Sequence, residues 1–394
     1  MIRGRVHSMW ATAALCVAVT ACSGGATGKD PPPPRSAEAD PSASATVSTV
    51  LRFPAPADTP FAASIRRRLD RTLQRSIATS AIGGVTAAVL TESGTWAGAA
   101  GKGPNGEPLV PLSSLMYASI TKTFTAAEIV LLAARGKVDL DERISAYVPL
   151  PVTDNGATVR HLLRMRSGIR DFLFGPQMAA AEQQPDRHWT PEQTLRDVPD
   201  DVDTAGAVNE YSNSNYILLG QLIEKVTGTT YAAALHRDLL DGRGLDGVAV
   251  QDEDAPRPPL ALPPGRIAGA GHHLPSRSLA SLAWSAGGIA GDAAAVARWG
   301  YLLYGGRVLP PDLVATMHPL DDGTAYGYGT ETLRSVDADV DFVGHSGDFG
   351  PYRSQLAVAT DRPMAIAVLL VHDNATADPS VVVEALASAF LAED

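Results

Sequence analysis

Cysteine is nearly missing from this chain of 394 residues, which contains only Cys16 and Cys22. Long apolar runs are missing as well, because the stretch Met9–Ala21 falls short of the roughly 20 residues that a transmembrane helix needs. Basic residues are outnumbered, with 32 Lys and Arg against 43 Asp and Glu, and there is no basic run that would suit nucleic acid. The surplus of acid indicates a solvated surface, so we expect no nucleic-acid partner.

The amino end has the pattern of a bacterial export signal. Arg3 and Arg5 form a basic start, Met9–Ala21 is almost wholly apolar or small, and Cys22 follows in the sequence Val-Thr-Ala-Cys. This pattern predicts a signal peptide over residues 1–21. Because its ending is similar to a bacterial lipoprotein box, we predict that Cys22 is lipidated and anchors the protein to the cell membrane, outside the cytoplasm. Ordinary cleavage nearby, which would leave a secreted protein, is the alternative.

Residues 22–56 are rich in Pro, Ala, Ser and Gly. Such a composition cannot bury enough apolar surface to become ordered, so we predict a disordered tether. Cys16 lies in the signal that is removed, and a lipidated Cys22 leaves no thiol for a disulfide, a nucleophile or a metal site. The mature protein is therefore expected to work without cysteine chemistry.

Residues 57–394 are predicted to form one domain of the α+β class. Apolar residues recur at every fourth position from Phe61 to Ile77, which predicts a helix. Further predicted elements are the strands 85–90, 95–100, 326–333, 339–345, 353–360 and 364–371, the helices 119–134, 215–226 and 381–391, and a helix that begins at Thr190. We therefore expect an antiparallel sheet assembled from both chain ends and flanked by helices, with a helical subdomain inserted at about 140–320.

Of the five lysines, only Lys122 has a serine three places before it, in Ser119-Ile120-Thr121-Lys122. The pair opens a predicted apolar helix, and residues three apart share a helix face. A serine at a helix start lies beside backbone N–H groups and the positive end of the helix dipole, and a lysine one turn on can accept or orient its proton. Taken alone, the pattern also fits Ser119 as a helix cap and Lys122 as a surface charge.

Tyr211-Ser212-Asn213 is the only Tyr-x-Asn sequence in the chain and lies just before the predicted helix at Asn215. A phenol, with a pKa of about 10, is a poor base at neutral pH. A cation about 4 Å away lowers that pKa by about three units at an effective dielectric constant of 20, and desolvation opposes part of this effect. We therefore predict that Tyr211 beside Lys122 acts as a base and titrates with it as a coupled pair. The alternative is an asparagine-rich turn.

Gly344-His345-Ser346-Gly347 is predicted to end the strand 339–345. Small residues at the end of a strand let a substrate pair with the strand edge, and they expose a backbone N–H group. His345 by itself is more often a structural residue than a catalytic one.

In this order, and at separations of about 90 and 130 residues, the Ser-x-x-Lys, Tyr-x-Asn and His-Ser-Gly motifs resemble those of the class C β-lactamase and D-alanyl-D-alanine carboxypeptidase family, the penicillin-binding-protein-like serine hydrolases. The stretches Thr158–Leu163, Ser167–Ile169, Ser285–Ile289 and Tyr326–Gly329 also resemble segments of that family. The resemblance runs from about residue 60 to the carboxyl end. It implies a β-lactamase/transpeptidase-like fold.

The resemblance also implies a role for each motif residue. Ser119 attacks a carbonyl group and forms an acyl-enzyme, while Lys122 and Tyr211 move its proton and Tyr211 later activates water. The backbone N–H groups of Ser119 and Asp348 would form the oxyanion hole. Residues expected to contact the substrate are Asn213, His345, Ser346, Gly347 and Asp348, and Asn213 is expected to hydrogen-bond either the substrate or Lys122. The family chemistry needs no metal or cofactor, and we expect a monomer that acts on a small molecule or a peptidoglycan peptide.

Two departures from the family pattern bear on the substrate. His345 stands where many members have lysine, and Asp348 is expected on the same strand face as Ser346, where a substrate carboxylate would dock. The arginine that carboxypeptidases of this type carry has no counterpart at Glu331 or Thr332. The first hypothesis is D-alanyl-D-alanine carboxypeptidase or β-lactamase-type hydrolysis of an amide or ester. The alternative is weak activity on such carboxylates, and hence an esterase of the same family.

Three other functions agree less well with the sequence. Ser285 approximates the nucleophile elbow of α/β-hydrolases, but that motif needs a strand before the serine, and a helix or loop is expected there. An inactive relative that serves as a tethered binding protein is a further alternative, but the intact Ser119, Lys122 and Tyr211 argue against it. A metallohydrolase would need a ligand spacing that His272-His273 lacks.

Overall fold

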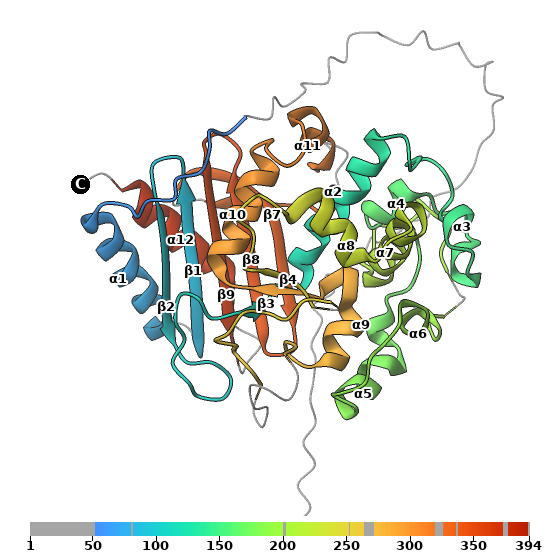
Figure 1. Ribbon diagram of the computed structural model, residues 1–394, viewed down its shortest axis with the longest axis horizontal. Coiled ribbons are helices and arrows are strands. Elements are labelled where there is room, and N and C mark those ends of the chain that lie inside the picture. The colour runs from blue at the N-terminus through green and yellow to red at the C-terminus, as the bar shows by residue number, and fades with distance from the viewer. Residues whose placement is uncertain are drawn as a thin grey trace, which may run out of the picture. The chain divides into compact units, whose positions relative to one another are not determined.

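A six-stranded antiparallel sheet runs through the computed structural model, with helices on both of its faces (Figure 1). Its strands are β1 (Gly84–Thr91) and β2 (Thr95–Gly101) from one end of the domain, and β6 (Glu331–Ser335), β7 (Val340–Phe349), β8 (Tyr352–Ala359) and β9 (Met364–Val371) from the other. Their order is β2-β1-β9-β8-β7-β6, so the two ends of the chain meet where β1 pairs with β9. The predicted α+β class, with one sheet built from both chain ends, is confirmed.

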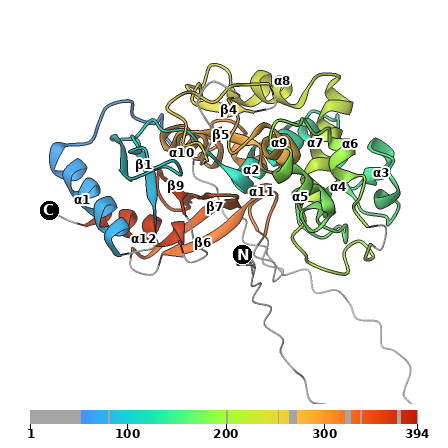
Figure 2. The same ribbon diagram turned by 90° about the horizontal axis from the view of Figure 1, so that it is seen from below.

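Three helices cover the sheet, α1 (Ala63–Thr79) and α12 (Pro379–Leu391) on one face and α10 (Ala293–Tyr304) on the other (Figure 2). Successive side chains of a strand point to opposite faces, which decides what each residue contacts. In β1, Val85 and Val89 belong to the core under α1 and α12, whereas Ala88 and Leu90 belong to the core on the other side. Both faces of the sheet are therefore buried, and a slip of one residue in register would exchange these two sets.

Most of the remaining helices lie to the right of the sheet in Figure 1. The further elements are α2 (Thr121–Ala134), α3 (Ile144–Tyr147), α4 (Val159–Leu163), α5 (Pro176–Gln183), α6 (Pro191–Leu195), α7 (Asn213–Thr227), α8 (Tyr231–Leu235), α9 (Arg277–Gly287) and α11 (Pro311–Met317), with the short helical turns η1 (Ala118–Ile120), η2 (Pro151–Thr153), η3 (Phe172–Phe174) and η4 (His236–Leu240). A small sheet consists of β3 (Leu115–Met116), β5 (Ile289–Gly291) and β4 (Val248–Val250), in that order. The predicted helical insertion, about 140–320, thus also contains two short strands and α10, which packs on the main sheet.

The structure describes residues 52–79, 82–199, 202–251, 253–263, 272–319, 326–335, 338–372 and 377–392. The predicted signal peptide, the predicted lipidation site Cys22 and most of the predicted tether lie outside these residues. Phe53 is buried against Tyr301, with ring centroids 5.0 Å apart, so the packed part of the chain includes residues before position 57. Among the described residues, no helix combines the length and the apolar character needed to cross a membrane.

Two strands differ from their predicted bounds. β6 begins at Glu331 rather than at residue 326, because Gly327 donates its N–H to the carbonyl of Thr330 at 2.8 Å and Gly329 takes a φ of +60°. Glycine adopts this left-handed conformation at little cost, and the resulting turn precedes the strand. β7 runs on to Phe349, since residues 346–349 pair with residues 352–355 of β8. The Gly-His-Ser-Gly motif therefore lies within a strand and not at its end.

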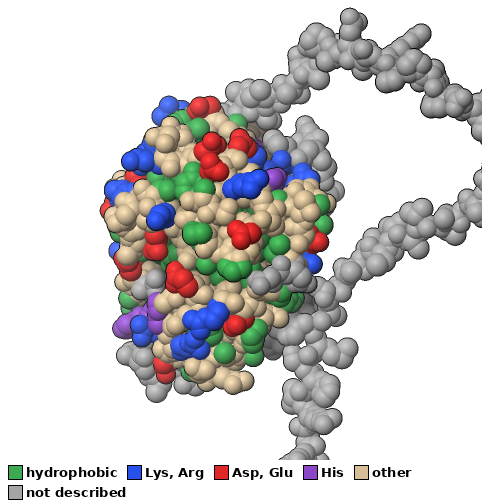
Figure 3. All heavy atoms as spheres, turned by 90° about the vertical axis from the view of Figure 1, so that its right-hand side faces the viewer, with side chains coloured by type: hydrophobic (Ala, Val, Ile, Leu, Met, Phe, Trp, Pro, Cys, Tyr) green, Lys and Arg blue, Asp and Glu red, His purple; other side chains and the backbone are tan. Residues whose placement is uncertain are grey.

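Charged side chains of both signs are interspersed over the described part of the face drawn in Figure 3. Some of the surface charges are paired, such as Arg160 with Asp141 at 2.7 Å. Exposed ion pairs of this kind contribute only about 0–1 kcal/mol to stability. The surplus of acid is therefore spread over a mixed, solvated surface on this side of the molecule.

A buried carboxyl group on α2 allows a test of the packing. Glu128 is fully buried beside Asp238, and burial, with the Asp238 charge adding to it, raises the pKa of Glu128 from 4.5 to about 8. Between about pH 4.5 and 8 the folded state therefore keeps a proton on Glu128 that the unfolded chain releases. The stability that this proton contributes is fully present below about pH 4.5 and is lost as pH rises through about 8. At pH 9 we expect Glu128→Gln to melt roughly 2–4 °C above the wild type. Thermal melts at pH 6 and pH 9 test this, and an equal difference at both would contradict it.

Candidate active site

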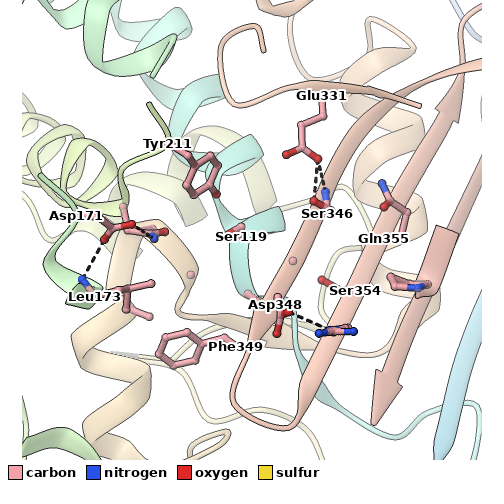
Figure 4. Close-up of a pocket in the computed structure, with 18 of the residues that line it drawn as sticks. Ser119, Asp171, Leu173, Tyr211, Glu331, Ser346, Asp348, Phe349, Ser354 and Gln355 are labelled. Carbon is pink, nitrogen blue, oxygen red and sulfur yellow. Dashed lines mark hydrogen bonds and ion pairs between the residues drawn. The ribbon is translucent and has the colours of Figure 1, made fainter. Parts of the chain in front are cut away.

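A pocket of about 680 Å³ lies between the helices and strand β7. Its walls come from η1, η3, the start of α7, α9 and the strands β6, β7 and β8 (Figure 4). The predicted site residues that line it are Ser119, Tyr211, Asn213, Ser346, Gly347 and Asp348. Residues that are more than 200 positions apart in the chain thus face one cavity.

Ser119 lies in η1, the turn that leads into α2. The residue before it, Ala118, has a φ of +49°, a costly conformation for a residue with a side chain. Tyr117 holds this segment in place, because its N–H donates to the carbonyl of Ile289 at 2.8 Å and its own carbonyl accepts from Ser354 Oγ at 2.7 Å. These bonds fix the strained backbone that presents Ser119 to the pocket.

Lys122 is fully buried beside the nucleophile. Its Nζ donates to Ser119 Oγ at 2.9 Å, to Asn213 Oδ1 at 2.7 Å and to the carbonyl of Ala286 at 2.8 Å. Burial lowers the pKa of Lys122 to about 7, although two nearby carboxylates oppose the shift. A large share of Lys122 is therefore uncharged at neutral pH, and the uncharged amine can accept the proton of Ser119.

The structure changes the prediction for Tyr211. Its ring centroid lies 4.9 Å from Lys122 Nζ, and its hydroxyl is hydrogen-bonded to Ser119. Although 39 % of the residue is exposed at the pocket, the hydroxyl lies among protein atoms, and desolvation raises the pKa of Tyr211 well above its usual value. The predicted fall of this pKa towards neutrality is therefore wrong, because burial outweighs the effect of the cation. Tyr211 carries a neutral hydroxyl near pH 7, and the basic group beside Ser119 is Lys122.

Asp171 is a residue of the site that the sequence motifs did not indicate. It is buried, its Oδ2 accepts from Nδ2 of Asn213 at 2.7 Å, and its Oδ1 accepts from the N–H of Leu173 at 3.0 Å. The bond to Asp171 orients the amide of Asn213, so that the amide oxygen faces Lys122. The sequence held only a weak signal for it, an acid two residues beyond the Ser-Gly-Ile stretch.

His345 does not line the pocket. Its side chain is 1 % exposed, its Nε2 is hydrogen-bonded to the hydroxyl of Tyr326 at 2.9 Å, and its Nδ1 contacts the carbonyl of Ser346. Burial lowers the pKa of His345, so the ring is neutral near pH 7. The prediction that His345 contacts the substrate is corrected accordingly, because the ring joins β7 to the turn before β6.

The backbone of β7 passes close to the nucleophile at Gly347. A Cβ atom there would lie 2.5 Å from the carbonyl oxygen of Tyr117 and 2.3 Å from Ser354 Oγ, which is too close for real Cβ contacts. We expect Gly347→Ala to push β7 away from η1, lowering the free energy of unfolding by about 1–3 kcal/mol and slowing the acylation of Ser119. Denaturant melts and the rate of fluorophosphonate labelling measure the two effects. The control is Gly83→Ala, where the nearest atom would be 3.4 Å away, and a folded Gly347 variant that labels as fast as this control would contradict the expectation.

Glu331, at the start of β6, is a second carboxylate that acts on the site, besides Asp171. Its Oε2 accepts from both the N–H and Oγ of Ser346, each at 2.9 Å (Figure 4). Its charge raises the pKa of both Lys122 and Tyr211. The sequence analysis noted Glu331 only because the arginine found in carboxypeptidases of this family is absent there, and it predicted no role for the carboxylate. It reaches the site because it pairs with Gly344, two residues before Ser346, across the β6–β7 ladder.

Asp348 lines the pocket together with Ser346, as predicted, but its charge is paired. Arg353 lies directly opposite Asp348 in the β7–β8 ladder, and Arg353 Nε donates to Asp348 Oδ2 at 2.9 Å. The expected repulsion of a substrate carboxylate by Asp348 is therefore weakened by this partner. The carboxylates whose charges reach Lys122 are Asp171 and Glu331.

Neither rival site from the sequence is assembled. Ser285 lies within α9, fully buried, where its Oγ donates to the carbonyl of Tyr216 at 2.9 Å, and it is not one of the residues that line the pocket. His272 is exposed, and within the described ranges no group of three or more His, Cys, Asp or Glu residues could hold a metal ion. Ser119 is thus the serine that has both a basic partner and access to a pocket.

Residues 69–388 match the family model described as Beta-lactamase. The chain therefore belongs to the β-lactamase family of serine hydrolases. This agrees with the resemblance that its three motifs carry, and the arrangement of helices and antiparallel sheet is that of the β-lactamase/transpeptidase-like fold.

The individual relatives share only about a quarter to a third of their residues with this chain over the matched regions. Penicillin-binding protein 4* from Bacillus subtilis is 30 % identical over 154 residues, which make up 36 % of this chain but only 32 % of that relative. Among solved structures, a D-stereospecific amidohydrolase from Streptomyces sp. is 26 % identical with a TM-score of 0.66, covering 81 % of this chain and 98 % of that one. The D-amino acid amidase from Ochrobactrum anthropi SV3 has a TM-score of 0.68 and 22 % identity, covering 83 % and 99 %, so it is similar in fold.

Proposed function

We propose that the protein is an exported serine hydrolase that cleaves an amide or ester through an acyl-enzyme on Ser119. The observation that carries this proposal is the contact of Lys122 Nζ with Ser119 Oγ at 2.9 Å, together with the pKa of Lys122, which burial lowers to about 7. A buried amine that is partly uncharged at neutral pH, next to a hydroxyl in a pocket, supports nucleophilic catalysis.

In the proposed reaction, uncharged Lys122 takes the proton of Ser119 while Oγ attacks the carbonyl carbon of the substrate. The backbone N–H groups of Ser119 and Asp348 stabilise the oxyanion. Tyr211, hydrogen-bonded to Ser119, passes its own proton to the leaving group and regains one from the Lys122 ammonium, so one proton moves overall. Water then attacks the acyl-enzyme through the same groups in reverse, which releases the acid and restores Ser119.

The charges of the pocket support a substrate without a carboxylate next to the cleaved bond. Glu331 is held against Ser346, and the guanidinium of Arg353 is already paired with Asp348. A substrate carboxylate docking at Ser346 would meet the negative charge of Glu331 without a cation to offset it. The names of the structural relatives, a D-stereospecific amidohydrolase and a D-amino acid amidase, support amide hydrolysis.

A D-alanyl-D-alanine carboxypeptidase or β-lactamase-type activity is the second candidate. It is supported by the similarity to penicillin-binding protein 4* and by the same three motifs. The location outside the cytoplasm, with a lipid anchor at Cys22, is likewise our proposal and is supported by the signal-like amino end alone.

A panel of acyl donors distinguishes the candidates. The protein is incubated with a penicillin, a D-Ala-D-Ala peptide, a D-amino acid amide and a neutral p-nitrophenyl ester, and adducts are followed by intact-mass spectrometry alongside product release. We expect adducts or turnover with the amide and the ester, and slow reaction with the two carboxylates. Efficient acylation by penicillin at neutral pH would reverse the choice of substrate and leave the Ser119 chemistry standing. No reaction with any donor would favour the inactive binding relative.

A further inference from the structure

We propose that Glu331 binds a primary ammonium group of the substrate, so that the enzyme acts on amides or esters that carry a free amine close to the reacting carbonyl. This inference rests on the proposed Ser119 acyl-enzyme chemistry and names the substrate class for it. It starts from one carboxylate that lines the same pocket as Ser119 and has one oxygen in use and one directed at the cavity.

The two oxygens of Glu331 have different surroundings. Oε2 takes two hydrogen bonds from Ser346, at 2.9 Å each, which fix the side chain on the wall of β7. Figure 4 shows the other oxygen, Oε1, turned towards Tyr211. Oε1 lies 3.8 Å from His345 Nε2, but that nitrogen is engaged with Tyr326, and burial lowers the pKa of His345 so that the ring is uncharged near pH 7. The carboxylate is therefore held in place without a cationic partner among these neighbours.

Glu331 can be reached by a ligand, since its side chain is 30 % exposed. Among the described residues that line the pocket, Arg353 is the one basic side chain, and Asp348 holds it at 2.9 Å. Lys122 lies nearby, but burial keeps its amine partly uncharged. A bound ammonium group would thus supply the positive charge that the pocket lacks, and a charged hydrogen bond in a partly enclosed site is stronger than a neutral one.

The other pocket carboxylates fit this role less well. Both oxygens of Asp171 already accept hydrogen bonds, from Asn213 and from Leu173. Asp378 caps α12, where its Oδ1 accepts from the N–H and Oγ of Ser380. The charges of both Asp171 and Glu331 raise the pKa of Lys122 and of Tyr211, but Glu331 has an oxygen, Oε1, that faces the cavity.

Apolar side chains lie on the opposite side of the pocket and suit a hydrophobic group on the same ligand. Leu173 and Phe349 line it, and Figure 4 shows both on the side of the cavity away from Glu331. A ligand with an ammonium group and an aromatic ring can therefore reach both walls. Phenylalaninol and 3-phenylpropanol form a suitable pair of probes, because they share the ring and the hydroxyl and differ in the amine.

The test measures how well each alcohol protects Ser119 from a fluorophosphonate, which does not require turnover. For the wild type, phenylalaninol is expected to protect at a concentration roughly tenfold or more below that of 3-phenylpropanol, the size expected for one charged hydrogen bond. Glu331→Gln keeps an oxygen for Ser346 and removes the charge, so the advantage of the amine should disappear. The control is Asp341→Asn. Asp341 is a carboxylate of β7 that is paired with Arg334 at 2.7 Å and does not line the pocket, so its loss should leave the advantage of the amine unchanged.

Each outcome bears on one proposal. Equal protection by the two alcohols in the wild type overturns the role of Glu331, and so does an unchanged advantage in Glu331→Gln. Both results leave the Ser119 chemistry intact, since labelling has occurred. Failure of the wild type to label at all contradicts the proposed function itself. If Glu331→Gln does not fold, as judged by circular dichroism, the comparison of the two alcohols in the wild type can still overturn the proposal, because the amine is the only difference between them.

Discussion

Replacing Ser119 with alanine is expected to abolish covalent labelling by a fluorophosphonate and to reduce hydrolysis roughly 10⁴- to 10⁶-fold. The reason is that Ser119 Oγ is the hydroxyl that both contacts a basic nitrogen, Lys122 Nζ at 2.9 Å, and lines the pocket. Without it, no acyl-enzyme can form, although the pocket can still bind substrate. Intact-mass spectrometry and steady-state kinetics measure the two losses.

The matched control is Ser285→Ala. Ser285 directly precedes Ala286, whose carbonyl accepts a hydrogen bond from Lys122, but the Oγ of Ser285 donates to the carbonyl of Tyr216 in the core. Its loss is expected to lower stability by about 1 kcal/mol and to leave labelling in place. If Ser119→Ala still formed an adduct and Ser285→Ala did not, the assignment of the nucleophile would be reversed.

Replacing Lys122 with methionine is expected to slow acylation by about 10²–10⁴-fold. Burial lowers the pKa of Lys122 to about 7, so the wild-type acylation rate should rise with pH up to about 7 and then level off. The sign follows from the chemistry, since the protonated amine below that pH cannot accept the proton of Ser119. In the Lys122 variant this dependence should vanish, and the measurement is the rate of acylation between pH 5 and 9.

Two variants sharpen this test. Lys225→Met removes an exposed lysine in the last turn of α7 and should leave both rate and pH profile unchanged. Tyr211→Phe should slow acylation but retain the step near pH 7, because the pKa of Tyr211 lies well above its usual value. Loss of the step in Tyr211→Phe, with its survival in the Lys122 variant, would show that the tyrosine is the base after all.

The parts of the site that could be predicted are those set by local geometry. Ser119 and Lys122 are three residues apart at the start of a helix, and that spacing alone places one beside the other. The hairpin of β1 and β2 and the apolar face of α1 are similarly local. Asn213 was predicted to contact Lys122 or substrate, and it accepts a hydrogen bond from Lys122 at 2.7 Å.

The residues that were missed or misread depend on contacts between distant segments. Glu331 and Asp171 carry charge into the pocket, yet they lie outside the three motifs and are far from Ser119 in the chain. His345 was expected to face the substrate, but pairing of β7 with both neighbouring strands places its ring against Tyr326. The direction of the pKa shift of Tyr211 was predicted wrongly, because the sequence indicates a nearby cation but not how deeply the hydroxyl is buried.

By itself, the sequence determined the class of chemistry: a serine and a lysine on one helix turn, two further motifs in family order, and hence a serine hydrolase of the β-lactamase family. Periodicity also determined that both chain ends supply strands to one sheet. Only the tertiary structure decided which charges surround the nucleophile. Strand register sets Glu331 beside Ser346 and pairs Asp348 with Arg353. The physical reason is that the spacing of hydrophobic residues is a local property of the sequence. The electrostatic environment of a group, by contrast, is the sum of the effects of residues that only the folded chain brings together.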